Sequence, residues 1–195
     1  MPTDLEWEAL DWTGLEHVVV CADAAGFCGR GQLILGPPIG PVTVSYELSC
    51  GASWRVNGLT ITADSSAGSR TLALVADQDG RWLADGQPRS DLDGCIDVDI
   101  SLTPLTNTLP IQRLTWARGE AQDIDVVYVD APALTARRAR QRYTLLGGDT
   151  NDGAAVYRYE SGSFTADVTV DSDGFVTDYP GLWRRVDGPS AGAKT

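Results

Sequence analysis

The sequence predicts an all-β protein built as an antiparallel sandwich, roll or barrel. Short runs of β-branched and aromatic residues recur along the chain, and many of them alternate between apolar and polar side chains. The segments between these runs are rich in Gly, Asp, Asn, Ser and Pro, which are the residues that turns require. Because no segment has a long helical pattern, we expect little helix.

The predicted strands follow one another along the chain with turns between them. Residues 42–48 (VTVSYEL) give the clearest pattern, because Val42, Val44, Tyr46 and Leu48 share one face. The first half of the chain contributes predicted strands at residues 18–22, 31–35, 42–48, 54–62, 71–76 and 82–84. The second half contributes predicted strands at residues 96–102, 111–116, 124–129, 143–146, 156–160, 164–170 and 175–177. Residues 131–141 fit either a short helix or an edge strand whose arginines face outward, and both remain open.

The motif Asp-x-Asp-Gly occurs three times, beginning at Asp77, Asp91 and Asp171. Loops of alternating acidic residues with a glycine bind calcium, but such a loop needs a glutamate at its last position. The residues at that position here are Pro88, Leu102 and Leu182, whose side chains cannot be ligands. Asp-Gly is also a strong hairpin signal, because glycine supplies the positive φ of a tight turn. We therefore predict three chain reversals at these motifs.

The size and charge of the chain restrict its organisation and its partners. Its 195 residues fit one β domain, which we place at residues 1–186, followed by a flexible tail at residues 187–195. The formal net charge is −12. An acidic surface repels nucleic-acid phosphates and anionic lipid headgroups, although overall charge does not describe a local pocket. We expect no nucleic-acid partner and no membrane span, and the sequence predicts no oligomeric state.

The N-terminal stretch MPTDLEWEALDW has neither the basic nor the apolar segment of a signal peptide, which predicts a cytoplasmic protein. The four cysteines do not have the spacing of a zinc site. They are Cys21, Cys28, Cys50 and Cys95. Because disulfides are rare in the cytoplasm, we expect free thiols. A bridge between Cys21 and Cys28 across a hairpin is the alternative.

Several catalytic chemistries lack their residues in this sequence. His17 is the single histidine, so a hydrolase triad would have to use it. One histidine does not suffice for a histidine-based metal site. No P-loop or dinucleotide-binding fingerprint occurs. We therefore expect neither a cofactor nor a metal, and we interpret His17 as an ordinary strand residue.

Two aspartates lie two residues apart in the segment DGCIDVDISL, residues 93–102. In a strand, Asp97 and Asp99 stand about 7 Å apart on one face. This spacing is compatible with paired-carboxylate catalysis. The simpler interpretation is a solvated strand face with arginine partners, and Arg113 on the next predicted strand is a candidate. Catalytic carboxylate pairs usually come from different elements, which favours the simpler interpretation.

The next stretch, TPLTNTLPIQRL at residues 103–114, has the appearance of a strand that two prolines interrupt. Pro104 and Pro110 cannot donate ladder hydrogen bonds, so strand pairing must stop there. Such a break is expected at the rim or corner of a curved sheet. Thr106 and Asn107 offer a hydroxyl and an amide at the break, which either contact a ligand headgroup or satisfy the local backbone.

The chain contains six tryptophans, which is many for its length. They are Trp7, Trp12, Trp54, Trp82, Trp116 and Trp183. Tryptophans in a β protein usually fill the core, but they also line cavities for acyl chains or stack on sugars. We expect most of the six in the core. Trp12 and Trp54, near the starts of strands, are the candidates for lining a cavity.

Three segments of the sequence resemble a known family. They are GCIDVDISLTPLTNTLPIQRL at residues 94–114, QRYT at residues 141–144 and FTADVTVDSDGFVTDYPGLWRRV at residues 164–186. They are similar to the putative glycolipid-binding family of bacterial proteins, with looser agreement at Trp12, Glu16, Tyr46 and Trp54. The resemblance implies a strongly curved antiparallel sheet, a roll or half-barrel of roughly ten to thirteen strands, similar to the fold of periplasmic lipoprotein carriers.

The resemblance also implies that a glycolipid or another lipid-like small molecule binds, without catalysis, on the concave face of the sheet. Apolar side chains there would shelter acyl chains, at about 0.8 kcal/mol for each buried methylene. The predicted ligand-binding residues are Asp97, Asp99, Thr106, Asn107, Arg113, Trp12 and Trp54. Two alternatives remain. One is an enzyme that uses Asp97 or Asp99 on a small substrate in the same cavity, and the other is a structural or interaction module with a filled core.

Overall fold

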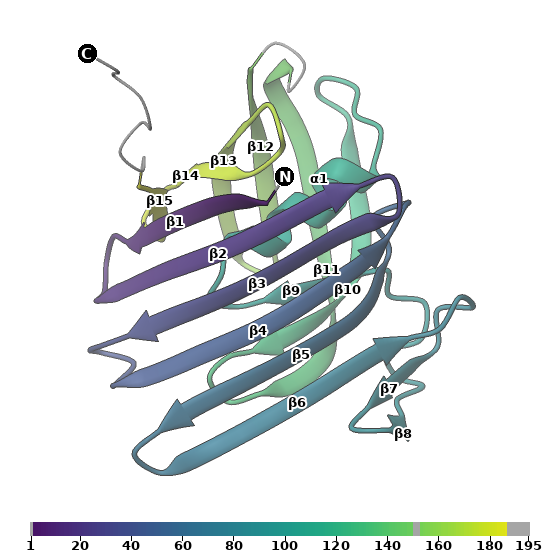
Figure 1. Ribbon diagram of the computed structural model, residues 1–195. Helices are drawn as coiled ribbons and strands as arrows, with labels where there is room; N and C mark the ends of the chain where they lie inside the picture. The colour runs from purple at the N-terminus through teal and green to yellow at the C-terminus, as the bar shows by residue number, and fades with distance from the viewer. Residues whose placement is uncertain (1, 150–152, 187–195) are drawn as a thin grey trace.

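The described part of the chain forms a single large sheet with one short α-helix (Figure 1). The computed structural model describes residues 2–149 and 153–186, and these residues form fifteen strands in the order β8-β7-β6-β5-β4-β3-β2-β1-β15-β14-β13-β12-β11-β10-β9. All neighbouring pairs are antiparallel except β9 and β10. The predicted β class is confirmed. The sheet is not closed, because β8 and β9 form its two open edges, and it is not strongly curled. The expected roll or half-barrel is therefore not found.

The first half of the chain forms one run of antiparallel hairpins. Its strands are β1 (Thr3–Ala9), β2 (Gly14–Asp23), β3 (Gly26–Leu35), β4 (Val42–Gly51), β5 (Val56–Ser65), β6 (Gly68–Ala76), β7 (Trp82–Ala84) and β8 (Gln87–Pro88). The alternating pattern of β4 is realised as predicted, since Val44, Tyr46 and Leu48 are all buried. This face of the sheet forms a large part of the hydrophobic core.

The second half contains the helix and the remaining strands. They are β9 (Asp97–Ile100), η1 (Leu105–Asn107), α1 (Thr108–Arg113), β10 (Ala121–Asp130), β11 (Thr135–Asp149), β12 (Ala154–Ser161), β13 (Phe164–Asp171), β14 (Val176–Tyr179) and β15 (Trp183–Arg185). The two halves join where β1 pairs with β15, two strands that were not predicted. The expected tail at residues 187–195 lies outside the described residues. Within the described ranges, no helix is long and apolar enough to cross a membrane.

The segment from Thr103 to Arg113 differs most from its prediction. It is not a broken strand at the rim, because η1 and α1 lie between the two halves of the sheet (Figure 1). Leu105 and Leu109 are fully buried, and Leu105 packs against Gly29 of β3. Pro110 fits here because the first turn of a helix needs no hydrogen bond from its N–H groups. The predicted strand at residues 111–116 is therefore wrong.

The arginine-rich stretch forms part of β11, so the strand interpretation of residues 131–141 is the right one from Thr135 onward. β11 is not an edge strand, however, because it lies between β10 and β12. Alternate arginines face an acidic row on β10. Arg138 pairs with Asp125, and Arg140 and Arg142 both pair with Asp123.

The three Asp-x-Asp-Gly motifs form turns, as predicted. In two of them the first aspartate accepts backbone N–H groups across the turn, Asp77 from Asp79 and Asp171 from Asp173. The glycine of each motif has a positive φ between 75° and 88°. These conformations are open to glycine because it has no Cβ.

Cys21 and Cys28 form a disulfide, which corrects the expectation that all four cysteines are free. The two residues are cross-strand partners in the β2–β3 hairpin, with Cα atoms 5.2 Å apart, a distance at which a bridge forms readily. Cys50 and Cys95 are free thiols in the interior. The cytoplasmic location stays a prediction.

We expect the Cys21–Cys28 bridge to stabilise the fold by about 2.5 kcal/mol, because it closes a short loop in the unfolded chain. A variant with Cys21→Ser and Cys28→Ser should therefore show a free energy of unfolding that is lower by about that amount in urea titrations. Alkylation of the unfolded, unreduced protein should modify only Cys50 and Cys95. Modification of all four cysteines under these conditions would show that the bridge does not form.

Candidate functional site

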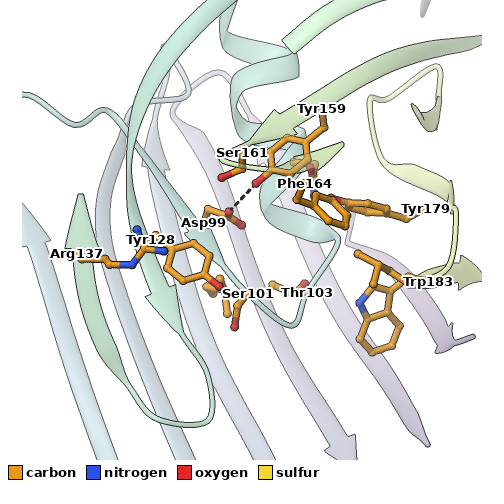
Figure 2. Close-up of a pocket in the computed structure, with 13 residues that line it drawn as sticks. Asp99, Ser101, Thr103, Tyr128, Arg137, Tyr159, Ser161, Phe164, Tyr179 and Trp183 are labelled. Carbon is orange, nitrogen blue, oxygen red and sulfur yellow. Dashed lines mark hydrogen bonds between the residues drawn. The ribbon is translucent and has the colours of Figure 1, made fainter. Parts of the chain in front are cut away.

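A cavity of about 320 Å³ lies where the end of β9 meets β10, β12, β13 and the turn before β15 (Figure 2). One part of its wall is aromatic and consists of Tyr128, Tyr159, Phe164, Tyr179 and Trp183. Its polar lining consists of Asp99, Ser101, Thr103, Asn107, Arg137 and Ser161. A second hollow of about 320 Å³ lies beside Arg55 and Cys95, but no aromatic side chain of the described residues lines it. The first cavity therefore has the chemistry of a small-molecule site.

Asp99 is the carboxylate of this cavity, and three side chains hold it. Thr106 Oγ1 donates to Oδ1 at 3.2 Å, and Gln141 Nε2 and Tyr159 Oη donate to Oδ2 at 2.5 and 3.3 Å. Burial raises the pKa of the Asp99 carboxyl above its usual range, and the three hydrogen bonds act in the opposite direction. The three hydrogen bonds thus fix the orientation of the Asp99 carboxyl group.

Asp97 does not line the cavity, although it precedes Asp99 by two residues on β9. Its two oxygens accept a fork of hydrogen bonds from Arg113, at 3.0 Å from Nε and 2.6 Å from Nη2. Asp97 is 1% exposed and the Arg113 side chain 13%. Burial raises the pKa of Asp97, and the Arg113 guanidinium opposes that shift. The expected arginine partner is therefore present, but it comes from α1 and not from a strand.

The polar residues of the 103–107 turn have both local and cavity-facing roles. Asn107 lines the cavity, donates to the Pro104 carbonyl and accepts the Tyr143 hydroxyl at 3.1 Å. Thr106 is buried and accepts the Ile100 N–H while it donates to Asp99. The two roles expected for these residues, contact with a ligand and hydrogen bonding to the local backbone, are therefore compatible. Their hydrogen bonds fix the turn, and Asn107 still faces the cavity.

The two candidate tryptophans lie in different places. Trp12 packs edge-on against Trp183 of the cavity wall, with ring centroids 5.5 Å apart. Trp54 stacks on Phe27 at 4.8 Å and does not line the cavity. Of the seven predicted ligand-binding residues, the structure thus brings Asp99 and Asn107 to the cavity wall. Thr106 and Trp12 contact side chains of the wall, while Asp97 and Arg113 form a buried pair elsewhere.

A buried acid behind the cavity was not predicted as part of the site. Glu16 of β2 is fully buried, and its Oε1 accepts the Tyr46 hydroxyl at 2.7 Å. Tyr46 can reach Glu16 because it lies across Gly31, where any Cβ would collide with its ring. The Tyr46 hydroxyl is also 3.3 Å from Thr103 Oγ1 on the cavity wall. The signal was present in the sequence, because Glu16 alternates in phase with Val18 and Val20 and so points inward.

We predict that Arg113→Gln lowers the free energy of unfolding by about 3–5 kcal/mol, because it leaves the buried Asp97 carboxylate without its partner. The matched control is Arg158→Gln on β12, whose pair with Asp167 is exposed and should contribute less than about 1 kcal/mol. Urea titration measures both variants. Equal losses would show that the Asp97–Arg113 pair has no special role in stability.

We predict that Glu16 makes the fold less stable as pH rises. Burial raises the pKa of Glu16 to about 8, so the folded protein holds this proton more tightly than the unfolded chain does. The contribution of this proton to the free energy of unfolding is complete below the ordinary pKa of 4.5 and is lost as pH rises toward about 8. The free energy of unfolding should fall by at most about 1.4 kcal/mol per pH unit in this range. Glu16→Gln should flatten the dependence on pH between these values. Parallel curves for the variant and the wild type would contradict the assignment.

Comparison with known proteins agrees with this architecture. The family model described as "Putative glycolipid-binding" matches residues 4–185. A crystal structure of a DUF1089 family protein from Pseudomonas aeruginosa is similar to this chain, with 35% sequence identity and a TM-score of 0.75. That similarity covers 88% of this chain and 92% of the Pseudomonas protein. No curated protein matches the sequence. The chain therefore belongs to the putative glycolipid-binding family, as its sequence motifs suggested.

Proposed function

We propose that this protein binds the sugar-bearing head of a lipid-like molecule in the cavity beside Asp99 and catalyses no reaction on it. The observation that carries the proposal is the meeting of an aromatic wall with hydrogen-bonding groups in one small cavity. Aromatic rings stack on the apolar faces of sugars, while carboxylate, amide and hydroxyl groups bond the sugar hydroxyls. The description of the family as glycolipid-binding points in the same direction.

The lipid tail is placed outside the cavity. The volume of about 320 Å³ is near the lower end of ligand pockets, which suits one head group. The inner face of the sheet offers no room for acyl chains as first expected, because buried side chains such as Leu105 and Leu109 fill it. Phe164 is 41% exposed and lines both the cavity and a shallow hollow beside Pro180. We place the first methylenes of the tail against this ring.

An enzyme is the second candidate, and one observation favours it. Asp99 is a carboxyl of raised pKa in a cavity, as a general acid would be. Its oxygens already accept three hydrogen bonds, however, and it is the one carboxylate among the described residues that line this cavity. Glycoside hydrolysis normally needs two. Binding therefore accounts for more of the arrangement than catalysis does.

A structural or interaction module is the remaining alternative from the sequence. The filled inner face of the sheet is what such a module requires. It gives no reason, however, for an open cavity that gathers five aromatic rings and six polar side chains. The cavity therefore favours binding over a purely structural role.

The proposal predicts that octyl β-D-glucoside, kept below its micelle concentration, binds the protein. Octyl tetraethylene glycol, which has the same tail without a sugar, should not bind. Tyr128→Ala removes part of the aromatic wall and should weaken glucoside binding about tenfold, which corresponds to about 1.4 kcal/mol. Isothermal titration calorimetry measures each affinity.

Trp54→Ala is the matched control, because it removes an aromatic ring that does not line the cavity. It should leave glucoside binding unchanged. Equal binding of both amphiphiles to the wild type, or a loss of binding in Trp54→Ala with none in Tyr128→Ala, would contradict the proposed site.

A further inference from the structure

We infer that the head group bound in this cavity is anionic, and that its carboxylate or phosphate pairs with Arg137. This inference rests on the proposed function and names its ligand class. It begins from an imbalance of charge. Ten arginines of the described residues form an ion pair with a carboxylate, in a chain whose net charge is −12. Four arginines of the described residues form no ion pair, and of these Arg137 is the one that lines the cavity.

The position of Arg137 is fixed by its neighbour on β10. Arg137 is the register partner of Tyr128, and its Cζ atom lies 4.5 Å from the centroid of the Tyr128 ring. Figure 2 shows this pair on the side of the cavity opposite Phe164, Tyr179 and Trp183, with Asp99 between them. A guanidinium that rests on an aromatic ring keeps its charge and N–H donors for a further partner. Arg137 thus presents an oriented cation at the cavity.

The carboxylates near Arg137 do not neutralise it by direct contact. The oxygens of Asp99 accept hydrogen bonds from Thr106, Gln141 and Tyr159 and none from Arg137, whose charge acts on Asp99 only from beyond contact distance. Asp130 lies two residues beyond Tyr128 on β10, is exposed and forms no ion pair with Arg137 in the described structure. The Arg137 guanidinium is therefore a cation of the cavity lining that has no ion pair in the described structure, although the protein as a whole is acidic.

This local charge selects among sugar-bearing heads. A neutral head would leave the Arg137 guanidinium paired only with water and the Tyr128 ring. A carboxylate or phosphate would accept two parallel N–H bonds from it, which is the geometry that arginine favours. The acidic surface repels anions at long range, so selection must come from this contact and not from steering.

The test compares two amphiphiles that differ in one group. Octyl β-D-glucuronide and octyl β-D-glucoside are each titrated into the wild type, Arg137→Gln and Arg140→Gln. Arg140 is the matched control, because it lies on the same strand, is 72% exposed and pairs with Asp123 on β10. We expect the wild type and Arg140→Gln to prefer the glucuronide at least about tenfold, as one charge-assisted pair provides. Arg137→Gln should lose this preference and keep its affinity for the glucoside.

Each other result has a definite meaning. Equal affinities for the two amphiphiles in the wild type, or a preference that survives in Arg137→Gln, would overturn the anionic head group and leave the proposed function standing. Failure of both amphiphiles to bind would overturn the proposed function and this inference with it. Free glucuronate and inorganic phosphate complete the set. If either binds as tightly as the octyl glucuronide, the site recognises a free anion and the lipid-borne ligand is wrong.

Discussion

The two aspartates of β9 are the constraint on which the architecture depends. Asp97 pairs with Arg113 and Asp99 with Thr106, so one short strand holds both ends of the buried η1–α1 segment. On the far side, Glu16 and Tyr46 reach Thr103. A polar segment in the interior of a sheet is stable only if its hydrogen-bonding groups are satisfied, and these carboxylates provide the acceptors. The segment in turn packs on both halves of the sheet and leaves one cavity beside Asp99.

Asp97 and Asp99 have different roles in the structure, although their spacing in the sequence does not distinguish them. Asp97 and Asp99 belong to one strand and to the same pattern, yet one is closed off by a bidentate arginine and the other faces a cavity. The cavity joins an aromatic wall, contributed by β10, β12, β13, β14 and β15, to the polar end of the buried segment. Arg137 adds a cation without a carboxylate partner in the described structure. Rigid placement of such groups favours selective binding, because little ordering remains to be done when a ligand enters.

Much of the fold could be predicted because its signals are local. The alternation of Val44, Tyr46 and Leu48 and the Asp-Gly turns depend on neighbours in the sequence, and both predictions are confirmed. The predictions are wrong where contacts between residues far apart in the sequence determine the structure. Pro104 and Pro110 stop a strand but also suit short helical turns, and only burial of Leu105 and Leu109 selects the helix. The Cys21–Cys28 bridge depends on a hairpin register that the spacing leaves undetermined. Of the site, Asp99 and Asn107 were predicted, but Tyr159, Tyr179 and Arg137 come from strands far along the chain and needed the structure.

A crystal structure of the protein with octyl β-D-glucuronide would show directly whether this cavity holds the head group. We expect a sugar ring in the cavity between Tyr128 and the wall of Tyr179 and Trp183, within hydrogen-bonding distance of Asn107 or Ser161. Its carboxylate should lie on Arg137, and its alkyl chain should pass Phe164. A sugar ring bound in the hollow beside Arg55, or on the outer face of the sheet with this cavity filled only by water, would contradict this expectation.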